Sequence, residues 1–108
     1  MDNATPVLLD DLLALTGTAI APVETILETA RVKLRTKLSV NDRVSAELVE
    51  QHQTAAHGLA WLATYTQPLR QMHKWATGLH AQDQFGEVEA LILQIAFGEY
   101  LWQVYGGI

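Results

Sequence analysis

The sequence predicts an all-α protein: an up-and-down helical bundle of three to four helices, with a long kinked third helix and a strongly apolar C-terminal helix. Three observations lead to this prediction. Apolar residues recur at helical spacing through most of the 108 residues. The breaks between these runs are short and contain residues that cap or weaken helices. The last run is apolar around most of its circumference, as expected for the inner helix of a single bundle domain spanning residues 1–108.

The first predicted helix covers about residues 6–16. Thr5 and Pro6 suit the N-cap and the first helical position, because a threonine side chain accepts from free backbone amides and proline needs no donor there. Leucines then follow at helical spacing. Gly17 weakens the helix at its end.

The second predicted helix covers about residues 22–37. Pro22 either begins this helix or kinks one continuous helix, and both alternatives are open. Apolar residues beyond it repeat at i, i+3, i+4 and i+7. The helix ends before residues 39–43, whose polar side chains compete for backbone hydrogen bonds.

The third predicted helix covers about residues 46–80, with Ser45 as its N-cap. Pro68 removes one backbone donor, so a kink is expected near residues 63–66, and a turn there is the alternative. Beside its apolar face lie small residues that would let another helix approach closely. They are Ala56, Gly58, Ala60 and Ala63.

The C-terminal helix is predicted over about residues 87–105, after a hairpin at residues 80–86. Glu87 lies at its positive dipole end, and Gly106 helps to stop it. Gly98 in its middle indicates a close helix crossing, because glycine there is otherwise unfavourable. We expect the rest of the chain, or another chain, to surround this helix.

Charge and composition exclude several classes of function. The net charge is −5, with 12 acidic and 7 basic residues, so we expect no nucleic-acid partner. There is no cysteine, which excludes disulfides and thiolate metal sites and favours a cytoplasmic location. Glu89, Gln94 and Glu99 interrupt the longest apolar run, so no membrane span is expected.

The four histidines do not predict a metal site. His52 and His57 are five residues apart, and His73 and His80 are seven apart. Neither spacing matches the i, i+3 or i+4 pairs that present metal ligands on one face of a helix. His57 with Trp61 at i+4 is instead expected to form a stacked or hydrogen-bonded edge to the core.

Two groups of residues are candidates for function. Glu99 lies within the apolar helix, where it is either an acid with a raised pKa or, as we favour, a carboxylate that reaches the edge of the bundle or pairs with Arg70 or Lys74. The candidate pocket consists of Glu99, His57, Trp61 and Tyr65. The candidate interface, where we expect uncovered apolar surface, consists of Tyr100, Leu101, Trp102, Val104 and Tyr105.

Several segments together resemble the N-terminal helical region of certain bacterial acyl-CoA dehydrogenase-like flavoproteins. They are residues 53–65 (QTAAHGLAWLATY), Leu69-Arg70-Gln71-Met72, Trp75-Ala76, Phe85-Gly86-Glu87 and residues 91–101 (LILQIAFGEYL). The resemblance implies a parent oxidoreductase that uses FAD and acts on an acyl-CoA. It places the flavin-binding body and the glutamate base beyond residue 108, so no catalytic or cofactor-binding residue is expected in this chain.

Three functions are therefore considered. The first is a non-catalytic helical scaffold or docking domain, covered by the remainder of a larger flavoprotein or by self-association. The second is a free-standing small-ligand-binding bundle or small enzyme with a pocket around Glu99. The third is a homodimerisation module.

Overall fold

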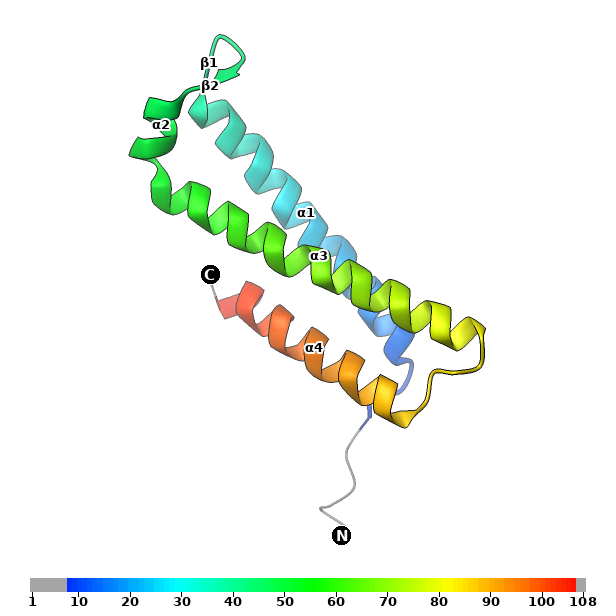
Figure 1. Cartoon of the computed structure of the whole chain (residues 1–108). Helices are drawn as coiled ribbons and strands as arrows, with labels where there is room; N and C mark the ends of the chain where they lie inside the picture. Colours follow the sequence, from blue (N-terminus) through cyan, green and yellow to red (C-terminus); the bar gives the residue numbers. More distant parts are fainter. Residues whose placement is uncertain (1–7, 107–108) are drawn as a thin grey trace.

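The protein is helical, with one very small sheet (Figure 1). The structure, a computed structural model, describes residues 8–106. Its elements are α1 (Leu12–Leu38), β1 (Ser39–Val40), β2 (Arg43–Val44), α2 (Ala46–Gln51), α3 (Gln53–Ala81) and α4 (Glu87–Gly106). The predicted all-α class is confirmed.

The three long helices run up, down and up again, with α3 packed against both α1 and α4 (Figure 1). Helix α4 is shorter than the other two and lies along only part of them. The molecule is elongated, and its Cα atoms extend over 59 × 31 × 16 Å. At the end away from α4, the two remaining long helices are joined by the small β-hairpin and α2 (Figure 1).

The core lies where all three long helices meet. Its buried apolar residues are Leu12, Ile20 and Val23 from α1, Leu69 and Ala76 from α3, and Ala90, Leu93 and Phe97 from α4. Two buried threonines are satisfied within their own helices: the Thr16 hydroxyl donates to the Leu12 carbonyl at 2.9 Å and the Thr66 hydroxyl to the Leu62 carbonyl at 2.7 Å. Burial therefore leaves neither hydroxyl without a partner.

Helix α1 is one continuous helix, which confirms the alternative that Pro22 lies within a single helix, whereas the separate bounds 6–16 and 22–37 are wrong. Pro22 lies inside it, and buried core residues lie on both sides of this proline, at Ile20 and Val23. Their burial in one core offsets the cost of the lost backbone hydrogen bond. The helix begins at Leu12, after a turn in which Asp11 has φ 55°.

The expected start of the first helix is also corrected. Residues 8–11 are not helical in the structure, although the prediction placed them in the first helix. The predicted cap at Thr5 and Pro6 lies outside the described residues.

Residues 39–44 form a two-stranded antiparallel hairpin, where the sequence indicated only a break. Val40 pairs with Arg43 across a two-residue connection, and both connecting residues have positive φ, 52° at Asn41 and 62° at Asp42. Positive φ at both positions defines the turn that matches the twist of paired strands, and Asn and Asp tolerate it well. The Asn41-Asp42 pair is the feature of the sequence from which this hairpin turn could have been predicted.

The third predicted helix is divided into α2 and α3 at His52. The Ser45 hydroxyl accepts from the Leu48 amide at 3.3 Å, which confirms the predicted N-cap. His52 leaves helical geometry with φ −117° and ψ 37°, so the prediction of one helix over 46–80 is wrong. The break lets α2 contact both α1 and α3 before α3 runs back along α1.

Pro68 lies inside the continuous helix α3, so the alternative of a turn there is wrong. Thr66 and Leu69 on either side of Pro68 are fully buried against the core. As at Pro22, packing on both sides of the proline holds the helix together despite one missing donor.

Helix α4 matches its predicted bounds within one residue, but it lies at the edge of the bundle. Only Ala90, Leu93 and Phe97 are fully buried in it. Val88, Ile95 and Trp102 are 65%, 67% and 68% exposed, so the prediction of an inner helix is wrong within this chain. The reason is that α1 and α3 provide neighbours on only one side of α4.

The close helix contact predicted at Gly98 occurs at Gly17. A Cβ atom at Gly17 would lie 2.9 Å from Nε2 of His73 on α3, whereas a Cβ at Gly98 would meet nothing within 4 Å. His73 Nε2 lies 3.0 Å from the Leu13 carbonyl oxygen, and its N–H donates to that oxygen in the matching tautomer. Gly17 therefore leaves room for a ring that links α3 to α1.

Replacing Gly17 by alanine is expected to destabilise the fold by about 1–3 kcal/mol, because the His73 ring must move and lose its hydrogen bond. Gly58 is the matched control: it is helical, and a Cβ there meets nothing within 4 Å. Gly58→Ala should stabilise by about 0.5–1 kcal/mol. Urea denaturation measures both, and equal effects of the two substitutions would contradict the Gly17 contact.

The edge position of α4 is tested by two truncations within that helix. Leu93→Ala should cost about 2–5 kcal/mol because Leu93 is fully buried. Ile95→Ala should change the stability of the single chain by less than about 0.5 kcal/mol, because Ile95 faces solvent. Thermal denaturation of the dilute protein measures both, and a large loss from Ile95→Ala alone would mean that this face is covered within the chain.

Candidate functional site

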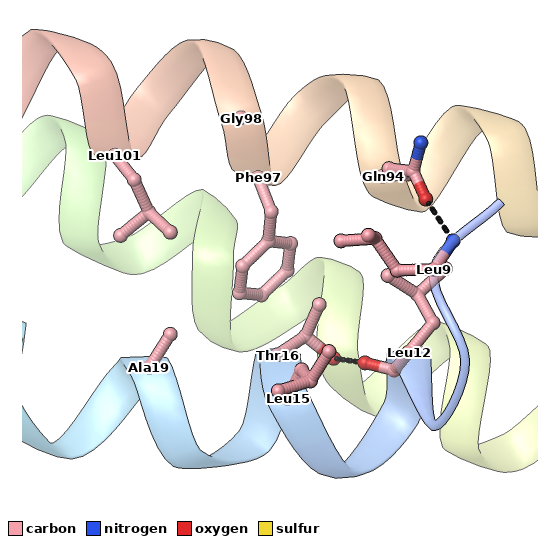
Figure 2. Close-up of a pocket in the computed structure, with 9 residues that line it drawn as sticks. All are labelled: Leu9, Leu12, Leu15, Thr16, Ala19, Gln94, Phe97, Gly98 and Leu101. Atoms are coloured by element: carbon pink, nitrogen blue, oxygen red, sulfur yellow. Dashed lines mark hydrogen bonds between the residues drawn. The ribbon is translucent and has the colours of Figure 1, made fainter. Parts of the chain in front are cut away.

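An apolar groove lies between α1 and α4, and we call it the α1/α4 groove (Figure 2). It has a volume of about 450 Å³ and is open on one side. Its lining residues are Leu9, Leu12, Leu15, Thr16, Ala19, Gln94, Phe97, Gly98 and Leu101. The α1/α4 groove was not predicted from the sequence, because its formation depends on how two distant segments are placed side by side.

Helix α1 forms one wall of the groove, α4 forms the other, and α3 lies behind both (Figure 2). Phe97 and Leu101 project from α4 toward α1, where Thr16 and Ala19 face them. The fourth side of this arrangement is open to solvent, so the groove corresponds to the place of a fourth helix in a four-helix bundle.

The polar groups of the groove are already engaged. The Gln94 side-chain oxygen accepts from the Leu9 amide at 2.8 Å, which fixes the segment before α1 against α4. The Thr16 hydroxyl donates to the Leu12 carbonyl within its own helix. Leu9 and Leu15 on the rim are 54% and 51% exposed. The groove therefore presents apolar surface, suited to apolar side chains more than to a charged ligand.

Three of the predicted pocket residues form an aromatic row on α3, which continues onto α4. Trp61 Nε1 donates to His57 Nε2 at 2.6 Å, which confirms the predicted hydrogen bond, but both side chains are exposed, so their predicted place at the edge of the core is wrong. The ring centroids of Trp61 and Tyr65 are 5.8 Å apart, and those of Tyr65 and Tyr100 are 5.5 Å apart. Contacts of this kind between aromatic rings tie the two helices together.

Glu99 does not join these aromatic residues in a cavity. It is exposed on α4, and it is not among the residues that line the α1/α4 groove. Arg70 pairs with Glu24 of α1 at 3.3 Å, so the alternative of an Arg70–Glu99 pair is wrong. The exposure of Glu99 confirms the alternative of a carboxylate at the edge of the bundle. The pocket predicted around Glu99 thus has no counterpart among the cavities described for residues 8–106.

The perturbed ionisable groups of the described part of the chain lie on the solvated face of α1. Arg31 hydrogen-bonds to Glu28 at 2.6 Å, which lowers the pKa of the Glu28 carboxyl and raises that of Arg31. Both side chains are largely exposed, and the pair is an ordinary i, i+3 contact on a helix surface.

The predicted interface residues divide into two sets. Tyr100, Leu101 and Val104 are half-buried and pack against the core. Trp102 and Tyr105 face solvent, with Tyr105 86% exposed, and their ring centroids lie 6.1 Å apart. Of the predicted interface residues, Trp102 and Tyr105 are therefore the ones that expose apolar surface. Their role in an interface stays a prediction.

The described residues contain no metal-binding cluster, but they include one helix that is long enough to cross a membrane. Within residues 8–106, no group of three or more His, Asp or Glu side chains could hold a metal ion. Helix α1 is long and apolar enough to cross a membrane by length and composition, with a best mean hydropathy of 1.2. Core helices of soluble proteins pass the same test, but only 17% of this apolar stretch of α1 is buried, although Leu12, Ile20 and Val23 join the core.

Comparison with known proteins identifies a relative. No protein-family model matches the chain. The chain is 54% identical over 101 residues, 94% of its length, to the (2S)-methylsuccinyl-CoA dehydrogenase of Cereibacter sphaeroides. The chain resembles an acyl-CoA dehydrogenase. The resemblance inferred from separate segments between residues 53 and 101 is thus confirmed, and it extends over nearly the whole sequence. The chain spans 18% of the length of that dehydrogenase.

Proposed function

We propose that the chain is a non-catalytic helical docking domain of an acyl-CoA dehydrogenase-like flavoprotein. The observation that carries this proposal is the 54% identity to one part of a dehydrogenase, of which the chain spans 18%. The cysteine-free composition is consistent with a cytoplasmic setting, which is part of the proposal.

The uncovered groove supports a docking role. Leu9 and Leu15 leave apolar surface exposed on its rim, and Phe97 and Leu101 line its α4 wall. An amphipathic helix of the dehydrogenase body would complete the bundle by placing its apolar stripe in this groove. Association of this kind removes apolar surface from water, which is the main driving force for stable docking.

The residues that line the α1/α4 groove do not fit FAD. A flavin dinucleotide needs donors for its two phosphates, usually a glycine-rich turn at a helix N-terminus or basic side chains. The α1/α4 groove contains neither lysine nor arginine, and its two polar side chains are already hydrogen-bonded. In this proposal the flavin and the catalytic base are held by the rest of the dehydrogenase, and this domain supplies packing surface.

The isolated chain is therefore expected to be colourless and inactive. After purification and incubation with FAD, it should retain no flavin absorbance following gel filtration. It should also reduce no electron acceptor in the presence of (2S)-methylsuccinyl-CoA. Retained flavin, or acceptor reduction that depends on the acyl-CoA, would contradict the non-catalytic assignment.

A chimera tests docking directly. The matching segment of the Cereibacter sphaeroides dehydrogenase is replaced by this chain, and the chimera is expected to retain flavin and activity. Leu15→Asp in the chimera should lower its Tm by about 5 °C or more, because a carboxylate would be buried without a partner. The same substitution in the isolated chain should have little effect on Tm, since Leu15 is half exposed there.

Val40→Asp is the matched control for the chimera, because Val40 is 56% exposed on the β-hairpin and lies outside the groove. It should leave the Tm of the chimera within about 2 °C of the unsubstituted form. A chimera in which Leu15→Asp and Val40→Asp have equal, small effects would show that the groove is not covered by the dehydrogenase body.

A further inference from the structure

Helix α4 has two apolar stripes, and the fold uses only one. The inner stripe contributes Ala90, Leu93 and Phe97 to the core. The outer stripe, which we call the α4 seam, repeats at alternating intervals of three and four residues, as in a coiled coil. The α4 seam consists of Val88, Leu91, Ile95, Gly98, Trp102 and Tyr105.

Most of the α4 seam faces solvent. Leu91 is half-buried, and the other residues of the seam are exposed. A symmetric pair that covered these side chains and the neighbouring Ile92 would bury on the order of 1,300 Å² in all, within the range of about 1,200–2,000 Å² found for stable protein pairs. The exposed area thus suffices for a dimer.

We propose that the α4 seam pairs antiparallel with the same seam of a second copy of this chain. In one register every seam position meets a seam position of the partner: Val88 meets the partner's Tyr105, Leu91 meets the partner's Trp102, and Ile95 meets the partner's Gly98. Each pair sets a smaller residue against a larger one. The two-fold axis of the pair passes level with Ala96 and Phe97, as an isologous interface requires.

Gly98 is explained by this register. A Cβ atom at Gly98 would meet nothing within 4 Å, so no neighbour in the chain requires a glycine there. Glycine in the middle of a helix is unfavourable relative to alanine. In the antiparallel pair, the space beside Gly98 receives the partner's Ile95. A parallel pair would instead set Gly98 against the partner's Gly98, which leaves a gap. It would also set Trp102 against the partner's Trp102, where two large side chains would crowd each other.

The charges beside the seam also permit this register. Glu99 would lie opposite the partner's Ile92, and Gln94 opposite the partner's Leu101, so no like charges are directly opposed. Antiparallel helices also set opposite dipole ends side by side, which favours this orientation. The seam is self-complementary in size and free of charge conflict.

This inference is independent of the proposed docking function. The body of the dehydrogenase is assigned to the α1/α4 groove and the second copy to the α4 seam, two adjacent surfaces that share Gly98. The chimera tests the groove, whereas the association state of the isolated chain tests the seam, so either proposal can fail without the other.

The first experiment measures mass by sedimentation equilibrium from 1 to 100 μM, a range set by common dimer affinities. The chain should reach twice its monomer mass of 12.0 kDa. Ile95→Glu should weaken dimerisation by at least about tenfold, with an unchanged helical circular dichroism spectrum, because the side chain is exposed in the monomer. Val32→Glu is the control: Val32 is half exposed on α1, and its substitution should leave the affinity unchanged.

The second experiment determines the register. The chain has no cysteine, so single Val88→Cys and Tyr105→Cys variants carry one thiol each. Mixed and mildly oxidised, they should form the 88–105 disulfide in preference to the 88–88 and 105–105 forms, whose positions are separated by ~25 Å in the antiparallel pair. A monomer at 100 μM, equal effects of Ile95→Glu and Val32→Glu, or predominant 88–88 and 105–105 disulfides would overturn the proposal.

Discussion

The packing of α3 between α1 and α4 is the contact on which the rest of the structure depends. Leu69 of α3 and Leu93 of α4 are completely buried in the core that this packing creates. Two prolines remain inside continuous helices because buried residues lie on both sides of each of them. A proline removes one backbone hydrogen bond from its helix. The helix still continues through the proline when the residues before and after that proline contribute to one core. The long helices are thus a consequence of tertiary burial more than of local propensity.

Local features could be predicted from the sequence, and relative positions could not. The Ser45 cap, the His57–Trp61 contact and the bounds of α4 each depend on residues within a few positions of one another. Whether Gly17 or Gly98 lies at a helix crossing depends on which residues of another helix come opposite it. The continuity of α1 through Pro22 depends in the same way on contacts with distant parts of the chain.

The candidate site illustrates the same division. Glu99 drew attention because a carboxylate within an apolar helix is a candidate for a perturbed acid. Once Leu93 and Phe97 face the core, helical geometry places Glu99 near the opposite side of α4, where it faces solvent. The α1/α4 groove escaped prediction because its two walls are more than 70 residues apart in the chain. No sequence pattern in either wall identifies the other.

Helix α4 connects the two proposals. Its apolar residues require neighbours on more sides than α1 and α3 can occupy, because a helix covered on one face by two neighbours leaves its opposite face in water. A helix in the α1/α4 groove would cover the flank that includes Leu101, and a second copy on the α4 seam would cover the face that includes Ile95. Under these two proposals, the apolar circumference that indicated an inner helix belongs to an edge helix whose remaining neighbours lie outside its own chain. Within the single chain, only the stripe that includes Leu93 and Phe97 is buried.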